Sequence, residues 1–326
     1  MIRAGTTAFA DMYFSMDEVA SVVDRAGVRA RLGHGVISVG KSDTAAQADF
    51  ETGIETATTL QGAADGRVQT MLAPHSLTTV DDAMLAKTAD KAATLDVPVH
   101  AHVSETEDEV APITDAEGDR PAEYAADLGL LGPRTFVAHG VHLDEAEIQL
   151  LADRDTAVIH CPASNMKLAS GIAPVHRLIE AGVTVGLGTD GAGSNNDLDM
   201  FDEMRDAAMI GKLGADDASA LPAPAVLNMA TQGGADAIGL PGGQLETGGT
   251  ADIAVVDFET PHLTPVHDPV SHLVYATKGS DVRHTVCDGT VLMRDREVMT
   301  LDEPTILDRA RTHAHELTRR AESADE

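Results

Sequence analysis

Seven short apolar segments recur between Thr6 and Asp190, and each is followed by a polar or glycine-rich loop and then by a helical pattern. They cover residues 6–12, 29–36, 68–75, 97–103, 135–141, 156–162 and 184–190. Between them, stretches such as "DDAMLAKTADKAATL" have the periodicity of helices. Alternating buried strands and helices predict a parallel sheet covered by helices, and units of roughly 25–30 residues are typical of a (β/α) barrel.

The pattern of the chain changes after Gly242. The segments "GTADIAVVDF" and "HTVCDGTVLMRDREVM" have the pattern of β-strands, and Asp288-Gly289 is a favourable hairpin turn. We therefore expect residues 1–242 to form a barrel of the (β/α)8 TIM type that lacks one of its eight strands. Residues 243–300 are expected to give β segments of a small flanking β-sandwich domain, and residues 301–326 a C-terminal helix.

The chain carries 53 acidic and 23 basic residues, which gives a formal net charge of −30. Nucleic acids and anionic membranes repel such a chain, because phosphate binding requires a basic patch. The acidic residues are spread along the sequence. We interpret them as an adaptation to a cytoplasm of high salt concentration, and an acidic surface that binds a partner is the alternative.

Cysteines and long apolar runs are scarce. Cys161 and Cys287 are the only cysteines and lie far apart in the sequence, so neither a disulfide framework nor a cysteine zinc site is implied. No run of about 18 uninterrupted apolar residues occurs, and the N-terminus lacks the apolar region of a signal peptide. These features predict a cytoplasmic protein without a membrane span.

Four predicted strands end in ionisable residues, namely His75, His102, His139 and Asp190. Barrel active sites form where the strands end. One histidine in such a place is as easily a hydrogen-bonded core residue as a ligand, but four ionisable residues at the same end favour a functional site. Imidazole and carboxylate are the usual ligands of Zn²⁺ or Fe²⁺. Glu105, which follows His102 by three positions, has the chemistry of a proton carrier.

His100 and two loops leave alternatives open. Residues two apart on a strand share a face, so His100 and His102 form either a pair of metal ligands or a ligand above a core residue. We favour the core position for His100. Asn165 either reaches the site or caps a turn, and "GAGSNND" after Asp190 either cradles a ligand or is a tight connection.

Five segments carry a resemblance to a known family: "APHSLTTVDD", "VHAHVSETEDEV", "VAHGVHLDE", "HCPASNMKLASGIAPV" and "VGLGTDGAGSNNDLDMFDEMR". They resemble the amidohydrolase superfamily and, within it, the 5′-methylthioadenosine/S-adenosylhomocysteine deaminases. The likeness covers nearly the whole chain. It implies an enzyme with one divalent metal, zinc in the first place and iron as the alternative. Such an enzyme converts an adenine nucleoside into the inosine analogue and ammonia.

The resemblance also assigns roles to single residues. His102 is implied as a metal ligand of the fifth barrel strand, and Asp190 as the ligand of the eighth strand that also takes a proton from the attacking water. Glu105 is implied to carry a proton to the purine nitrogen N3. His139 is implied to orient the hydroxide. His75, Glu105 and Asp190 are implied to contact the nucleoside.

Two departures from the family pattern stand out. The family begins its barrel with a His-x-His pair on strand one, and this pair and a ribose-binding glutamate are missing here. The strand that the barrel lacks is therefore the first. The family often has arginines after its third strand, which bind the carboxylate of homocysteine. Here no arginine occurs between His34 and Arg67, and Lys41 is a weak substitute.

These departures lead to an expectation for the 326-residue chain. With strands 6–12 and 184–190 facing a gap, it is expected to bind zinc weakly, to lack deaminase activity and to aggregate. Two other functions stay open. One is a different deaminase, acting on guanine or another ring amidine. The other is a non-catalytic relative that binds a nucleoside or pairs with an active subunit. The expected partner is a small nucleoside, and assembly into a homo-oligomer is left open.

Overall fold

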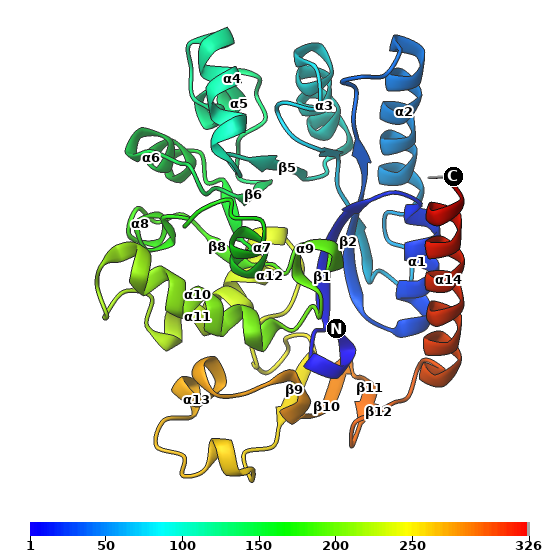
Figure 1. Cartoon of the computed structure of the whole chain (residues 1–326), viewed down its shortest axis with the longest axis vertical. Coiled ribbons are helices and arrows are strands. Elements are labelled where there is room, and N and C mark those ends of the chain that lie inside the picture. The colour runs from blue at the N-terminus through cyan, green and yellow to red at the C-terminus, as the bar shows by residue number, and fades with distance from the viewer. Residues whose placement is uncertain (325–326) are drawn as a thin grey trace.

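The computed structural model describes residues 1–324, and its main feature is an incomplete barrel of parallel strands (Figure 1). Its strands are β1 (Ala8–Tyr13), β2 (Arg29–Val36), β3 (Val68–Thr70), β4 (Ala73–Pro74), β5 (Val99–Val103), β6 (Thr135–His139), β7 (Ala157–His160) and β8 (Val185–Leu187). The predicted strand at 68–75 is divided into β3 and β4, which both pair with β2. The seven predicted strands are thereby confirmed.

The barrel sheet consists of two halves. One half has the order β1-β2-β3 with β4 also on β2, and the other has the order β5-β6-β7-β8. Two isolated parallel bridges join the halves, one from Leu72 to Val99 and one from Ser76 to His102. The sheet therefore runs continuously from β1 to β8, and the junction lies beside His102.

Helices follow the strands and cover the outside of the sheet. They are α1 (Met16–Ala26), α2 (Asp43–Thr59), α3 (Asp82–Leu95), α4 (Glu107–Glu117), α5 (Pro121–Asp127), α6 (Glu145–Asp153), α7 (Pro162–Lys167), α8 (Val175–Glu180), α9 (Ala192–Asn195), α10 (Met200–Ala215), α11 (Ala223–Ala230) and α12 (Gln232–Ile238). Local sequence sets their starts. The Asp81 carboxylate, for example, accepts a hydrogen bond from the Met84 amide and caps α3. No helix within residues 1–324 is apolar over enough of its length to cross a membrane.

A small apolar cluster fills the inside of the barrel and is separate from the core under the helices. Met71, Phe136, Ile159 and Cys161 belong to it.

Buried Arg31 lies on β2, and its guanidinium donates hydrogen bonds to the carbonyl oxygens of Thr70, Ile238 and Gly239. Burial lowers the pKa of Arg31 to about 10. The Arg31 side chain thus connects the C-terminal end of α12 to β2 and β3 through hydrogen bonds.

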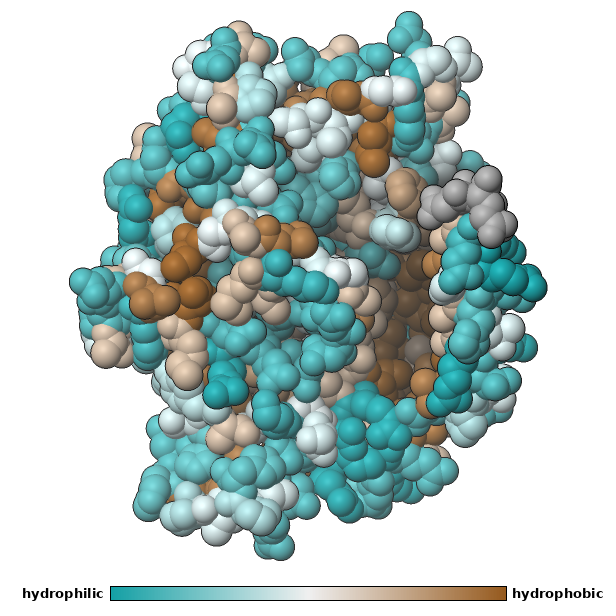
Figure 2. Space-filling view, in the orientation of Figure 1, coloured by the Kyte–Doolittle hydropathy of each residue, from teal (hydrophilic) through white to brown (hydrophobic). Residues whose placement is uncertain are grey.

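The sheet is open between its first and last strands. Within residues 1–324, β1 pairs with β2 alone and β8 with β7 alone. Figure 2 shows a separate hollow with a hydrophobic floor beside α14, on the side of β1 that faces away from β8 in Figure 1. The predicted gap between the strands at 6–12 and 184–190 is therefore present.

The remaining strands form a separate antiparallel sheet with the order β12-β11-β10-β9. They are β9 (Ile253–Val256), β10 (Val282–Cys287), β11 (Thr290–Arg294) and β12 (Glu297–Val298). Asp288 and Gly289 both have positive φ, 51° and 75°, which confirms the predicted hairpin turn between β10 and β11. A short helix, α13 (Pro269–Tyr275), lies between β9 and β10 in the sequence, where only strands were predicted.

The last helix lies at the edge of the molecule (Figure 1). It is α14 (Glu303–Ala324), and nearly all of its described side chains are exposed. Arg3 connects its first turn to the N-terminal segment through an ion pair with Glu303, with 2.6 Å between Nε and Oε1. The predicted helix at 301–326 is confirmed for the part that the structure describes.

Arg29 links the barrel to the small sheet. Its guanidinium binds Asp252 at 2.8 Å and Asp288 at 2.6 Å, and the side chains of Arg29 and Asp252 are almost completely buried. Charges buried in this way are stable only as long as both partners are present, because an unpaired buried charge is strongly unfavourable.

We expect Arg29→Ala to lower the free energy of unfolding by about 3 kcal/mol, because it leaves the buried Asp252 without its cation. The measurement is urea unfolding in high-salt buffer. Arg283→Ala is the matched control, since it removes an exposed ion pair with Asp295 and should change stability by about 0.5 kcal/mol or less. Equal losses for the two variants would contradict this role for Arg29.

Candidate active site

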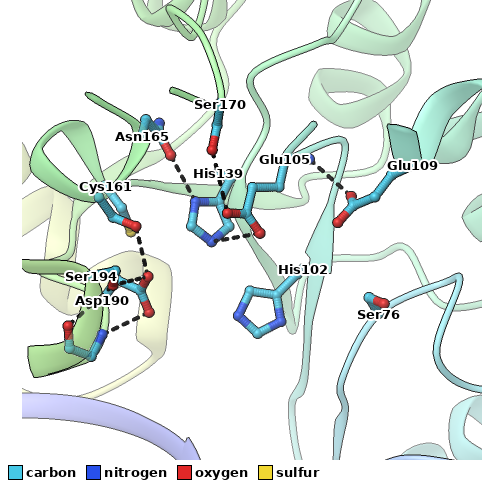
Figure 3. A network of polar contacts seen from close by, with 12 residues as sticks. Ser76, His102, Glu105, Glu109, His139, Cys161, Asn165, Ser170, Asp190 and Ser194 are labelled. Atoms are coloured by element: carbon cyan, nitrogen blue, oxygen red, sulfur yellow. Dashed lines mark hydrogen bonds and ion pairs between the residues drawn. The ribbon is translucent and has the colours of Figure 1, made fainter. Parts of the chain in front are cut away.

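All five predicted site residues lie together at the C-terminal ends of the barrel strands. His75 follows β4, His102 and Glu105 lie at the end of β5, His139 ends β6, and Asp190 follows β8. The ring centroid of His102 is 4.8 Å from that of His75 and 5.4 Å from that of His139. Figure 3 shows His102, Glu105, His139 and Asp190 around one space. Strand ends far apart in the sequence thus form one cluster.

His102 is held as a neutral imidazole with one free nitrogen. Its Nδ1 lies 2.6 Å from the carbonyl oxygen of His75, so Nδ1 carries the hydrogen and donates it. Burial lowers the pKa of His102 to about 3. The lone pair on Nε2 is then available, which is the state of a histidine that binds a metal.

Asp190 is held as a carboxylate by three hydrogen bonds. Its Oδ2 accepts from the hydroxyls of Ser164 at 2.7 Å and Ser194 at 2.5 Å, and its Oδ1 accepts from the Gly191 amide at 2.7 Å. Burial alone would raise the pKa of Asp190, but the bonds from Ser194, Ser164 and Gly191 bring it below its ordinary value. Asp190 is therefore ionised at neutral pH.

His139 and Glu105 face each other across the site (Figure 3). The Nε2 of His139 is 3.7 Å from Glu105 Oε2, and its Nδ1 is 2.9 Å from Asn165 Oδ1. Glu105 is fixed at its backbone, where its amide donates to Glu109 Oε2 at 3.0 Å. On its side chain, the Ser170 hydroxyl lies 3.5 Å from Oε1. An imidazole and a carboxylate therefore lie close to each other at the C-terminal end of the barrel.

His100 lies one layer deeper, as the core alternative predicted. It is buried, its Nδ1 is 3.0 Å from the carbonyl oxygen of Phe136, and its ring stacks on Phe136 with 4.4 Å between centroids. Burial lowers its pKa to about 4. A neutral histidine with a backbone partner and an aromatic neighbour is a stable core residue.

Sequence patterns missed several polar residues that hold the cluster in place. Ser164, Ser194, Ser170 and Glu109 bind the predicted site residues directly. Asn165 was weighed as a residue that reaches the site, and its bond to His139 shows that it does. Four of them lie in the first helical turns after strand ends, which is the one signal that pointed toward them, and Ser170 lies in the loop between α7 and α8.

The donor chemistry of two residues fits a divalent metal. His102 offers a free imidazole nitrogen and Asp190 offers an oriented carboxylate, and both are typical zinc ligands. Within residues 1–324, no three His, Cys, Asp or Glu side chains form a group that could hold a metal ion. Catalytic zinc sites usually have three protein ligands, so these two residues alone would not make a complete ligand set.

Lys41, in the loop after β2, is the candidate for binding a negatively charged substrate group, and His34 lies near it at the end of β2. His34 Nε2 is 3.0 Å from Asp49 Oδ1, and Lys41 Nζ is 2.8 Å from Asp49 Oδ2. The Ile37 amide also donates to Asp49 Oδ2, at 2.9 Å. Both groups are therefore already paired with one carboxylate.

Comparison with known proteins agrees with this arrangement. The sequence model of the Amidohydrolase family matches residues 1–292. The 5-methylthioadenosine/S-adenosylhomocysteine deaminase of Natronomonas pharaonis is 59% identical over 322 residues, which are 99% of this chain and 75% of the relative. The 5′-deoxyadenosine deaminase of Methanothermobacter thermautotrophicus is 46% identical over 318 residues, which are 98% of this chain and 74% of the relative.

Solved structures show the same fold. The crystal structure of an adenosine deaminase from Xanthomonas campestris with bound zinc superposes with a TM-score of 0.91 at 38% sequence identity. The match covers 97% of this chain and 72% of that structure. Matches of this extent, together with those in sequence, show that the chain belongs to the amidohydrolase family.

Proposed function

We propose that this protein deaminates an adenine nucleoside of the 5′-methylthioadenosine or 5′-deoxyadenosine class, giving the inosine analogue and ammonia. The observation that carries the proposal is the meeting of His102, Glu105, His139 and Asp190 at one end of the barrel. The relatives from Natronomonas pharaonis and Methanothermobacter thermautotrophicus, which are named as deaminases of such nucleosides, support the choice of substrate.

The proposal assigns His102 Nε2 and the Asp190 carboxylate as ligands of one divalent metal. Zinc is favoured because the similar adenosine deaminase from Xanthomonas campestris contains it. When bound, such an ion lowers the pKa of a water molecule to near 7 and so supplies a nucleophile for attack on adenine C6. Asp190, ionised and fixed by two serines, would accept a proton from the attacking water.

Glu105 delivers the proton that the ring requires. Addition of water to C6 saturates the C6–N1 bond, so the nitrogen that gains the proton is N1, and the assignment to N3 from the family resemblance is corrected on this chemical ground. The Glu105 carboxylate is partly exposed and borders His139, which places it between the site and solvent. His139, held by Asn165, orients the attacking oxygen, and His75 contacts the nucleoside.

A second candidate is a protein that binds nucleosides without turnover. The observation in its favour is that no three His, Cys, Asp or Glu side chains within residues 1–324 form a group that could hold a metal ion. Binding of 5′-methylthioadenosine without release of ammonia, measured in the presence of zinc, would identify this candidate.

The pairing around Asp49 bears on the 5′ substituent. S-adenosylhomocysteine carries a carboxylate, which needs a cation for tight binding. Lys41 in the loop after β2 and His34 at the end of β2 are already bound to Asp49. We therefore propose that the preferred substrates have an uncharged 5′ group.

Replacing either proton carrier tests the proposed chemistry. In a form extended to include strand one, we expect Glu105→Gln and Asp190→Asn each to lower kcat for 5′-methylthioadenosine by at least about 100-fold, because both keep the shape and remove the group that carries the proton. Ammonia release is measured with zinc in high-salt buffer. Glu107→Gln, on the exposed first turn of α4, is the control and should keep wild-type kcat. A kcat within tenfold of wild type for Glu105→Gln or Asp190→Asn would reject the assigned role.

Metal binding is tested separately from turnover. We expect His102→Ala to weaken zinc binding by at least about tenfold in a chelator competition, because it removes the free Nε2 lone pair. His267→Ala changes an exposed histidine far from the site in sequence and should leave the zinc affinity unchanged. Equal zinc affinity of wild type and His102→Ala would exclude His102 as a ligand.

Substrate choice follows from the paired state of Lys41. A missing charge-assisted contact typically costs about 1.5–3 kcal/mol, which corresponds to roughly a tenfold or larger difference in kcat/KM. We expect 5′-methylthioadenosine and 5′-deoxyadenosine to have higher kcat/KM than S-adenosylhomocysteine. Steady-state kinetics on the three nucleosides provides the comparison, and a clear preference for S-adenosylhomocysteine would show that another cation binds its carboxylate.

A further inference from the structure

Glu203 is a buried glutamate beside the site to which the mechanism above gives no role. It lies on α10, with 1% of its surface exposed. No Lys, Arg or His within residues 1–324 forms an ion pair with it, and burial raises its pKa to about 8. A carboxyl group buried without a cation is unfavourable, so its hydrogen-bond partners identify what it contributes.

Those partners come from two different loops. Glu203 Oε2 accepts a hydrogen bond from the Ala163 amide at 3.4 Å, and Oε1 accepts one from the Asn195 side-chain amide. Ala163 lies in the first turn of α7, after β7, and Asn195 ends α9, after β8. The other end of the Asn195 side chain accepts from the Leu198 amide at 2.8 Å, which keeps it oriented toward Glu203. One carboxyl group thus connects the two loops from inside the protein.

Each of these contacts is next to a serine that binds Asp190. Ser164 follows Ala163, and Ser194 precedes Asn195. Both serine hydroxyls donate to the same oxygen of Asp190, at 2.7 and 2.5 Å, and Figure 3 shows Ser194 against this carboxylate. In each loop, therefore, the residue that binds Glu203 and the serine that binds Asp190 are neighbours in the sequence.

We propose that Glu203 is a positioning residue, which holds Ser164 and Ser194 so that both hydroxyls point at Asp190. The inference rests on the proposed function, since Asp190 matters there as a metal ligand and proton acceptor. Partners behind a metal ligand typically change metal affinity by about 10- to 100-fold when they are removed. Glu203 acts one step further back, through the loops that carry these partners.

A cycle of variants separates this role from a general contribution to stability. Zinc affinity without nucleoside, and kcat and KM with it, are measured for Glu203→Ala in two backgrounds, wild type and Ser164→Ala/Ser194→Ala. In the wild-type background we expect about tenfold weaker zinc binding. In the background without the serine hydroxyls, the same change should have an effect of about twofold or less, because nothing remains for Glu203 to position.

Glu147→Ala is the matched control. Glu147 is also a fully buried glutamate on a helix, bound to two backbone amides (Ala122 and Asp144) and a side chain (Arg120), but it lies on α6. The Glu147→Ala variant should have a lower melting temperature, and its zinc affinity should stay within about twofold of the parent protein in both backgrounds. Glu203→Gln keeps one acceptor oxygen and should restore most of the affinity lost in Glu203→Ala. It also replaces the alanine variant in the cycle if that variant does not fold.

The outcomes are distinct. A loss of zinc affinity that is equally large with and without the serine hydroxyls would overturn the positioning role. Absence of zinc binding in the wild type would instead reject the metal assignment of the proposed function. In that case crystal structures of the wild type and Glu203→Gln decide about Glu203. Separation of either serine hydroxyl from Asp190 beyond about 3.5 Å in the variant supports the proposal, and two intact bonds overturn it.

Discussion

The hydrogen bond between the imidazole of His102 and the carbonyl oxygen of His75 connects the fold to the site. The same oxygen also accepts from the His102 backbone amide at 3.0 Å, next to the bridge that joins the two halves of the sheet. The carbonyl oxygen of His75 thus fixes both the junction of the two halves and the tautomer of His102, the proposed metal ligand. A shift of β5 by one residue would turn His102 away from the barrel.

Two opposite environments prepare the site residues for their proposed roles. Burial keeps His102 and His100 neutral, because charged imidazole is unfavourable away from water. Asp190 is more exposed, and three hydrogen-bond donors keep it ionised. The same barrel mouth therefore provides a neutral nitrogen donor and a charged oxygen donor. The difference comes from loops that bring hydroxyls to Asp190, and Glu203 lies behind those loops.

Sequence patterns predicted the strands well, because buried parallel strands are short apolar runs separated by amphipathic helices. The barrel topology then brings strand ends together, so the cluster of His75, His102, His139 and Asp190 followed from position alone. The division of the third predicted strand into β3 and β4, and the bonds of Ser164 and Ser194, did not follow. They depend on contacts between segments distant in sequence, which no local pattern encodes. Helix α13 was missed because it is short and lies between strand-like segments.

The central claim is that His102 and Asp190 bind one metal ion beside Glu105 and His139. Anomalous diffraction at the zinc edge, on crystals grown with zinc, tests it most directly. The account predicts one zinc ion about 2.0–2.1 Å from His102 Nε2 and about 2.0–2.2 Å from an oxygen of Asp190. Zinc bound elsewhere, or coordinated by His100 with His102 left free, would contradict it.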